Sequence, residues 1–122
     1  MKYTVFSSES VFGMANLPAK RTGLSADIWS DHKGIERSVS HRGTPRIKIS
    51  VGSYMVSVTI ESTPVIKAES KHGSKSQKAA VKEAMKYIGR NYDIFLKHYN
   101  DVNDEFDDED MFNALRERGE YK

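Results

Sequence analysis

Residues 31–44 of this 122-residue chain hold side-chain types that could bind a metal or carry out acid–base chemistry. The metal-ligand types in this segment are Asp31, His32, Glu36 and His41. Their spacing matches no specific metal site. Ser38, Ser40 and His41 could supply a nucleophile and its base, but no strand-to-helix elbow or oxyanion element accompanies them. We therefore expect a solvated loop with no metal, no cofactor and no catalytic residue, and an enzyme ranks last among the functions considered.

Fixed positive charge is a second feature that could do chemistry. The candidate residues for binding an anion or a nucleic acid are Lys20, Arg21, Arg42, Arg46, Lys48, Lys78, Lys82, Lys86 and Arg90. The last four recur every four residues, so in a helix they would form a continuous cationic ridge. Sparse aromatic interleaving and the lack of a recognised reader motif argue against base-specific recognition. A solvated helix face is the alternative interpretation of the ridge.

Negative charge is concentrated near the end of the chain. Residues 1–100 hold 16 lysines and arginines against 8 aspartates and glutamates, a net charge of +8, whereas residues 101–122 hold 3 against 9, a net charge of −6. The candidate residues for contacting a protein partner are Asp101, Asp104, Glu105, Asp107, Asp108, Glu109 and Asp110. They could belong to a bipolar binding surface, or they could solvate a terminal helix and partly neutralise the basic body.

The clearest structural pattern is a predicted β-hairpin whose first strand would position Arg46 and Lys48. Apolar and polar residues alternate over 46–51 and 54–60, which is the period of half-buried strands. Gly52 suits a two-residue turn in which glycine takes a positive φ. The core-facing residues of the first strand would be Ile47, Ile49 and Val51. We expect Arg46 and Lys48 to project together from the opposite face as an anion-facing or partner-facing surface.

The other strand signals are shorter. Residues 2–6 are β-prone and could form an edge strand, residues 26–30 predict a core strand, and residues 65–68 predict a short strand. Residues 7–16 show no sustained period and are predicted to be a loop. Residues 17–24 combine a proline, a glycine and two cations, which predicts a turn.

Three helices are predicted in the second half of the chain. Ser76 would cap the first helix, and Gly89 would end or kink it. Its apolar stripe consists of Val81, Ala84, Met85 and Ile88. Asn91 would cap a second helix, and Asp107 or Asp108 would cap a third. The apolar residues of these two helices are Ile94, Phe95, Leu96 and Tyr99, followed by Met111, Phe112 and Leu115.

Length and composition bound the class of protein. With 122 residues and no cysteine, we expect one α+β domain over residues 1–122, with strands over about 2–68 and helices over about 76–118, held by packing alone. The expected architecture is a three- or four-stranded antiparallel sheet with a central hairpin and two to three C-terminal helices packed on one face. No apolar run approaches the roughly 18 residues of a membrane span, and no signal-peptide pattern opens the chain. We expect a cytoplasmic protein without a membrane partner, and the oligomeric state stays open.

Four stretches carry a resemblance to a known family. They are residues 17–24 (LPAKRTGL), 27–30 (DIWS), 41–49 (HRGTPRIKI) and 91–99 (NYDIFLKHY). From Leu17 to about Leu115 the chain resembles an offshoot of a family of small bacterial and phage proteins, a domain of unknown function sometimes encoded beside toxin–antitoxin-like genes.

The resemblance also has a departure. The family has an Asp-His step, matched here by Asp31 and His32, and then a proline followed by two alternating histidines. Pro45 matches the proline, but Arg46 and Lys48 stand where the family has histidines. Permanent cations cannot ligate a metal or act as an acid–base pair there. The resemblance implies an architecture and carries no activity over to this chain.

Two functional hypotheses follow. The first is a small non-catalytic inhibitor or regulator that binds a protein partner, such as an anti-defence protein of a phage or mobile element, of the anti-CRISPR kind, acting on a host nuclease complex. Its acidic segment would mimic nucleic-acid charge, and in a phage setting it would act in the host cytoplasm. The alternative is a nucleic-acid-binding regulator or toxin–antitoxin-type component that uses the basic surface.

Overall fold

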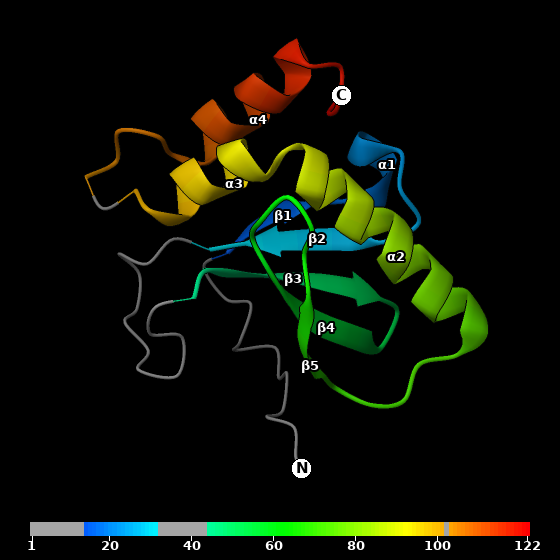
Figure 1. The fold of residues 1–122 in the computed structure, drawn as a ribbon. Helices are drawn as coiled ribbons and strands as arrows, with labels where there is room; N and C mark the ends of the chain where they lie inside the picture. The colour runs from blue at the N-terminus through cyan, green and yellow to red at the C-terminus, as the bar shows by residue number, and fades with distance from the viewer. Residues whose placement is uncertain (1–13, 32–43, 102) are drawn as a thin grey trace.

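The computed structural model describes residues 14–31, 44–101 and 103–122. Its elements in chain order are β1 (Ala15–Leu17), α1 (Ala19–Thr22), β2 (Asp27–Ser30), β3 (Arg46–Val51), β4 (Tyr54–Thr59), β5 (Ile66–Glu69), α2 (Lys75–Arg90), α3 (Tyr92–Tyr99) and α4 (Asp108–Glu117). Within these residues the strands form one antiparallel sheet in the order β1-β2-β3-β4-β5 (Figure 1). The α+β class is therefore confirmed, but the described part of the sheet has five strands instead of three or four.

The β3–β4 hairpin forms the centre of the sheet, as its alternating pattern predicts. Val51 and Tyr54 pair across the turn. Gly52 has a φ of +61°, a conformation that glycine adopts without a Cβ clash, so the predicted turn is confirmed. Ile47 and Ile49 are buried in the core, also as predicted.

β1 and α1 are the elements that the sequence did not predict. β1 lies in segments predicted to be loop and turn, because three residues are too few to show a period. The strand forms because it pairs with β2, where Leu17 lies opposite Ile28 and is completely buried. After it, the chain makes a single helical turn, α1, whose start is held to β2 by a 2.8 Å hydrogen bond from the Ala19 backbone N–H to Asp27 Oδ1.

Two further short strands were predicted, over residues 65–68 and 2–6. β5 occupies Ile66–Glu69, one residue later than the predicted segment 65–68. The edge strand predicted for residues 2–6 lies outside the described residues. β5 therefore forms one edge of the described sheet and β1 the other.

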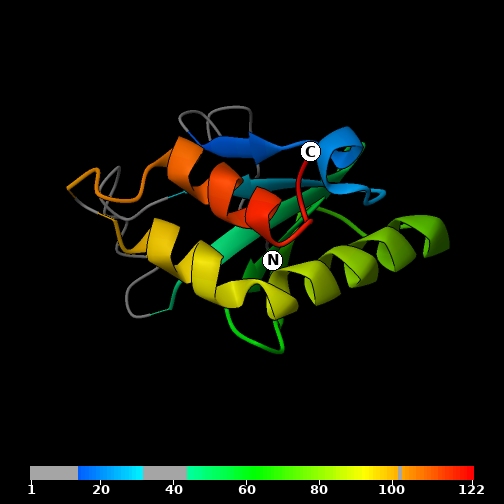
Figure 2. The same ribbon diagram turned by 90° about the horizontal axis from the view of Figure 1, so that it is seen from above.

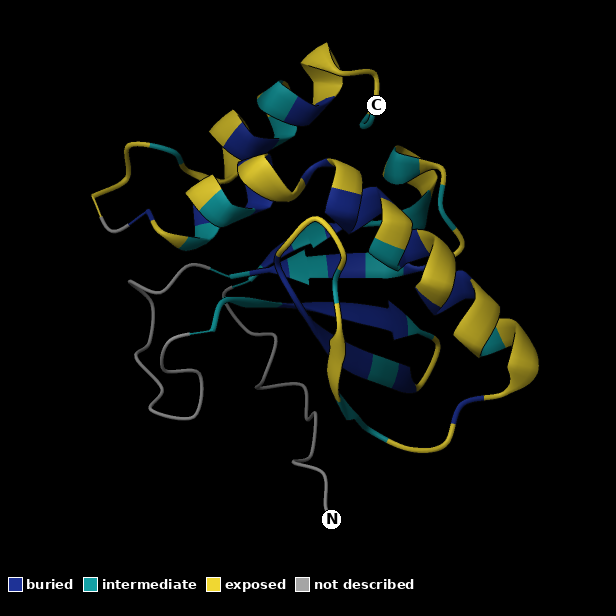
Figure 3. Cartoon of the chain, viewed as in Figure 1, coloured by how far each residue is buried: buried dark blue, intermediate teal, exposed yellow. Residues whose placement is uncertain are grey.

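Helices α2 and α3 cover one face of the sheet, and α4 packs against α3 (Figure 2). The core between these layers includes Val56 and Val58 from β4, Ile88 from α2 and Phe95 from α3. Figure 3 shows that the buried residues follow the inner faces of the helices, whose outer faces are exposed. Burying each large apolar side chain contributes about 1.5–3 kcal/mol, so this interface holds the two layers together.

α2 begins two residues earlier than predicted, with Ser74 and not Ser76 as its N-cap. The Gln77 N–H donates to Ser74 Oγ at 3.1 Å, and the Ser74 N–H donates to Gln77 Oε1 at 2.9 Å, which completes a capping box. Gly89 does not end the helix. It is buried within α2, where a Cβ atom would overlap the carbonyl oxygen of Ser62.

α3 and α4 match their predicted positions closely. Asp107 caps α4 and exchanges hydrogen bonds with Asp110, so the predicted cap is confirmed. Met111 and Leu115 are completely buried, and Phe112 stacks on Tyr121 with 4.8 Å between ring centroids.

No helix in the described parts of the chain is long and apolar enough to cross a membrane.

Candidate binding groove between α2 and β5

A groove of about 720 Å³ lies between α2 and the segment that leads into β5. Its apolar lining comes from Pro64, Ile66, Val81 and Met85. Its charged lining comes from Glu69 and from three lysines that we call the lysine row: Lys78, Lys82 and Lys86. An apolar surface and a row of cations therefore meet in one hollow, which we call the α2–β5 groove.

Helix geometry sets the lysine row. Its members are exposed and four residues apart, so their Cα atoms repeat about every 6 Å along α2. Val81 and Met85 each precede a lysine of the row and turn toward the core, where Val81 is buried and Met85 is half-buried. Like charges one turn apart repel by about 0.2–0.5 kcal/mol, and a bound anion would relieve that repulsion.

The opposite side of the groove is built by β4 and β5. Tyr54 is almost completely buried, and its hydroxyl donates a 2.7 Å hydrogen bond to Glu69 Oε1. Gly73 lies against the ring, and a Cβ atom there would come within 2.6 Å of Tyr54 Cζ. Because one carboxylate faces three lysines, the lining of the groove carries a positive net charge.

Apolar side chains extend from the groove to solvent. Ile66, which lines the groove, is 40% exposed, and its neighbour Val65 is 50% exposed. Exposed apolar surface beside a hollow with polar rims is typical of an interaction site. The groove, with the exposed part of Ile66, therefore forms the candidate site.

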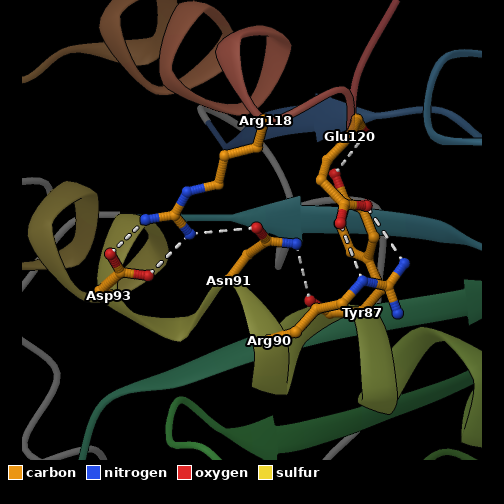
Figure 4. A network of polar contacts seen from close by, with 6 residues as sticks. All are labelled: Tyr87, Arg90, Asn91, Asp93, Arg118 and Glu120. Carbon is orange, nitrogen blue, oxygen red and sulfur yellow. Dashed lines mark hydrogen bonds and ion pairs between the residues drawn. The ribbon is translucent and has the colours of Figure 1, made fainter.

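The predicted ridge on α2 is divided by pairing at its C-terminal end. Arg90 Nε and Nη2 donate to the two carboxylate oxygens of Glu120 at 2.9 and 3.1 Å (Figure 4). This pairing raises the pKa of Arg90 and lowers that of Glu120. Tyr87 donates from its hydroxyl to the Glu120 carbonyl at 2.9 Å, which fixes the same segment from its backbone. Arg90 thus holds the C-terminal segment, whereas the lysine row faces the groove.

A second bidentate pair lies beside the first. Arg118 Nη1 and Nη2 donate to Asp93 Oδ1 and Oδ2 at 3.0 and 2.6 Å (Figure 4). The Asp93 pKa is lowered and the Arg118 pKa is raised, chiefly by these hydrogen bonds. Asn91 connects the pairs, because it accepts from Arg118 and donates to the Tyr87 carbonyl. The residues after α4 are thereby anchored to the junction of α2 and α3.

Two other predicted cations lie on α1. Lys20 and Arg21 are both exposed, as predicted. Arg21 Nη1 donates to the Lys122 carbonyl at 2.9 Å, and the Lys122 N–H donates to the Arg21 carbonyl at the same distance. Arg21 is therefore part of the anchor of the C-terminal segment and does not line the groove. Arg42, a further candidate, lies outside the described residues.

Arg46 and Lys48 do not form the solvent-exposed pair that the hairpin pattern predicted. Lys48 is only 8% exposed, and burial lowers its pKa, although the charge of Asp31 opposes that shift. Arg46 is half-buried, and within the described structure its Nε is buried without a hydrogen-bond partner. Strand alternation placed both side chains opposite the core face correctly, but it does not reveal whether that face is covered.

The predicted acidic residues take several structural roles. Asp101 was predicted to contact a partner at the surface, but it is buried, and its Oδ1 accepts a hydrogen bond from the Glu105 N–H at 2.8 Å. That prediction is wrong for Asp101. Asp107 and Asp110 form the cap of α4, and Asp108 contacts His98. The side chains that remain exposed are Asp104, Glu105, Asp107, Asp108, Glu109 and Asp110.

Ser30, His98 and Asp108 form a hydrogen-bonded trio that the sequence did not predict. His98 Nδ1 lies 2.8 Å from Ser30 Oγ, and its Nε2 lies 2.8 Å from Asp108 Oδ1. Ser30 is 1% exposed and His98 is not exposed at all, so a substrate cannot reach the hydroxyl. The trio joins β2, α3 and α4 and does not make a nucleophile. The sequence does contain a sign that His98 is buried, because His98 follows Ile94 by four residues and so lies on the apolar face of α3.

Metal ligation finds no support in the described residues, which hold no group of three or more histidine, aspartate or glutamate side chains able to surround an ion. Asp31 is described, but the other candidate residues for ligation or nucleophilic chemistry lie outside the described parts. They are His32, Glu36, Ser38, Ser40 and His41.

Comparisons of the chain with models of protein families, with curated proteins and with solved structures give no match. The resemblance to a bacterial and phage family over Leu17 to Leu115 therefore stays a prediction.

Proposed function

We propose that this protein is a non-catalytic binding protein that inhibits or regulates a partner protein by docking an acidic and apolar segment of it in the α2–β5 groove. One observation carries the proposal: the lysine row lies along the same hollow as the apolar side chains of Val81, Met85 and Ile66. A ligand that matches both surfaces must have anionic groups beside apolar groups, and the carboxylates and apolar side chains of an amphipathic protein segment meet both requirements.

The apolar lining favours a protein partner over a nucleic acid. A phosphate backbone would use the lysine row but would leave Ile66 and Met85 without apolar contacts. Bases could be accepted by stacking on aromatic rings, yet Tyr54, the aromatic residue of the lining, is almost completely buried. The other predicted cations are also dispersed, since Arg90 and Arg21 hold the C-terminal segment and Lys48 is buried.

The exposed acidic side chains near α4 are a second candidate contact. They motivate the narrower hypothesis of an anti-defence inhibitor that presents nucleic-acid-like charge to a host nuclease complex. Asp104, Glu105 and Glu109 are the residues to neutralise in testing it, because they are exposed and lie outside the helix cap and the contact with His98.

The test is an affinity pull-down from cells that naturally express the protein, with and without nuclease treatment. The groove variant is Lys78→Glu with Lys86→Glu, and the matched control is Lys20→Glu with Lys122→Glu. Both double variants change the net charge equally and alter exposed side chains. We expect one protein to bind the wild type and the control in stoichiometric amount, to survive nuclease treatment and to be lost with the groove variant.

Each other outcome contradicts part of the proposal. Loss of the captured protein after nuclease treatment would favour the nucleic-acid-binding alternative. Retention by the groove variant combined with loss on neutralising Asp104, Glu105 and Glu109 would place the interface on the acidic surface. Failure to enrich any protein over a bait-free control would refute the protein-binding function.

A further inference from the structure

Resting on the proposed function, we infer that the segment docked in the α2–β5 groove is an amphipathic α-helix with a row of carboxylates, and not a β-strand added to the edge of β5.

The edge of β5 is the first reason. Within the described residues β5 pairs with β4 alone, so an added strand would have to pair with its other edge. The register pairs Ser57 with Ala68 and Val58 with Ile66, which leaves Lys67 as an extra, bulged residue. A bulge interrupts the ladder of backbone groups, and an edge lysine opposes pairing with a further strand. A four-residue strand with this irregularity is a poor template for strand addition.

The spacing of the lysine row does not by itself distinguish a docked helix from an added strand. Carboxylates four residues apart on a helix repeat about every 6 Å, which equals the repeat of the lysines along α2. Carboxylates two residues apart on a strand repeat about every 6.6 Å, which is nearly as close. Both conformations fit the charges, so the irregular edge of β5 decides in favour of the helix.

The apolar lining fits the second face of such a helix. The floor provided by Val81 and Met85 lies beside the lysine row, and Ile66 lines the opposite side. A helix with apolar residues at i, i+3 and i+7 can bury that stripe in the groove while an adjacent row of glutamates faces the lysines. The expected recognition segment therefore carries acids four residues apart that flank an apolar stripe.

Two fluorescein-labelled peptides of about 16 residues, a length that gives more than four helical turns, test this inference directly. The helical probe is a lactam-stapled peptide with glutamates every four residues beside a leucine stripe. The second probe has the same composition, no staple, and glutamates and leucines in alternation, as a strand would need. Binding is followed by fluorescence anisotropy against the wild type, Lys82→Glu and the control variant Lys20→Glu.

We expect the helical probe to bind the wild type and Lys20→Glu saturably, with affinity that falls as salt is raised. Lys82→Glu should weaken it by about tenfold or more, because charge reversal in the middle of the row repels the glutamates. The strand-pattern probe should bind at least about tenfold more weakly than the helical probe.

Equal or tighter binding of the strand-pattern probe would overturn the inference, and so would binding of the helical probe that Lys82→Glu leaves unchanged. Absence of binding by both probes would also overturn it. None of these outcomes touches the pull-down result, because a partner protein can depend on the groove and yet present another conformation. Conversely, failure of the wild type to enrich any protein over the bait-free control would refute the proposed function whatever the peptides do.

Discussion

Arg90 and Glu120 form a bidentate ion pair that joins the last turn of α2 to the segment after α4, thirty residues later in the chain. Arg118 and Asp93 repeat the arrangement between the end of α4 and the first turn of α3. The two pairs surround Asn91, which is buried between α2 and α3. The carboxylates of Asp93 and Glu120 therefore hold the C-terminal segment in place, and protonating them in acid would break both ion pairs.

We expect the free energy of unfolding to fall in acid as these two carboxylates are protonated. The folded-state pKa values of Glu120 and Asp93 lie below the ordinary values of 4.5 and 3.8, so the folded state binds fewer protons than the unfolded state in this range. Their stabilising contribution is complete above about pH 4.5 and is lost as the pH falls through the lowered folded-state values. Urea unfolding of the wild type from pH 7 down to pH 3 measures this loss.

Variants show how much of the loss of stability in acid comes from these two ion pairs and how much from other titrating groups. At pH 7, Glu120→Gln and Asp93→Asn should each lower the free energy of unfolding by up to about 1 kcal/mol, because both pairs are partly solvent-exposed. Each variant should also reduce the loss of stability in acid, whereas Glu117→Gln, at an exposed site outside the pairs, should not. An unchanged acid profile in the Glu120→Gln, Asp93→Asn double variant would show that the pairs are not responsible.

A serine pair at the start of α2 provides a direct comparison of the observed and predicted caps. Ser74→Ala should lower the free energy of unfolding by about 1 kcal/mol, because it removes the acceptor for the Gln77 N–H. Ser76→Ala should change it by less than about 0.5 kcal/mol, since Ser76 is exposed and does not cap the helix. Urea denaturation of both variants measures the difference, and equal effects would contradict the observed cap.

The cap also illustrates how much of the fold could be predicted from the sequence. Period-two alternation correctly predicted β3 and β4, and the apolar stripe correctly placed Val81, Ala84 and Ile88 in the core. These patterns are local and long enough to repeat. β1 could not be predicted in the same way, because a three-residue strand exists through its pairing with β2 and has no period of its own.

The candidate site was predictable only in part, for the same reason. Spacing by four residues predicted the lysine row, and the row is exposed along α2. The other wall of the groove depends on where β5 and Tyr54 lie in three dimensions, which no local pattern contains. Likewise, the pairing of Arg90 with Glu120 and the burial of Lys48 are properties of tertiary packing.

The buried trio of Ser30, His98 and Asp108 should contribute to stability and not to binding. Ser30→Ala should lower the free energy of unfolding by about 1–3 kcal/mol, because it leaves His98 Nδ1 buried without this hydrogen bond. Asp108→Asn should lower the free energy of unfolding by less. The asparagine side-chain oxygen can still accept a hydrogen bond from His98 Nε2, and this end of the trio lies near the surface. Urea unfolding together with binding of the helical peptide separates the two roles. Loss of peptide binding in Ser30→Ala protein that is still folded would contradict this assignment.

Gly89 offers a test of the packing that shapes the groove. At an exposed helical position, replacing glycine by alanine stabilises a protein by up to about 1 kcal/mol through the backbone. At Gly89 we expect the opposite sign, a loss of about 1–3 kcal/mol, because the new Cβ would overlap the Ser62 carbonyl oxygen and push the groove-lining segment away from α2. Urea unfolding gives the sign, and nuclear magnetic resonance shifts of Ser62, Thr63 and Pro64 report the displacement. Stabilisation by Gly89→Ala would show that this segment does not rest on the helix.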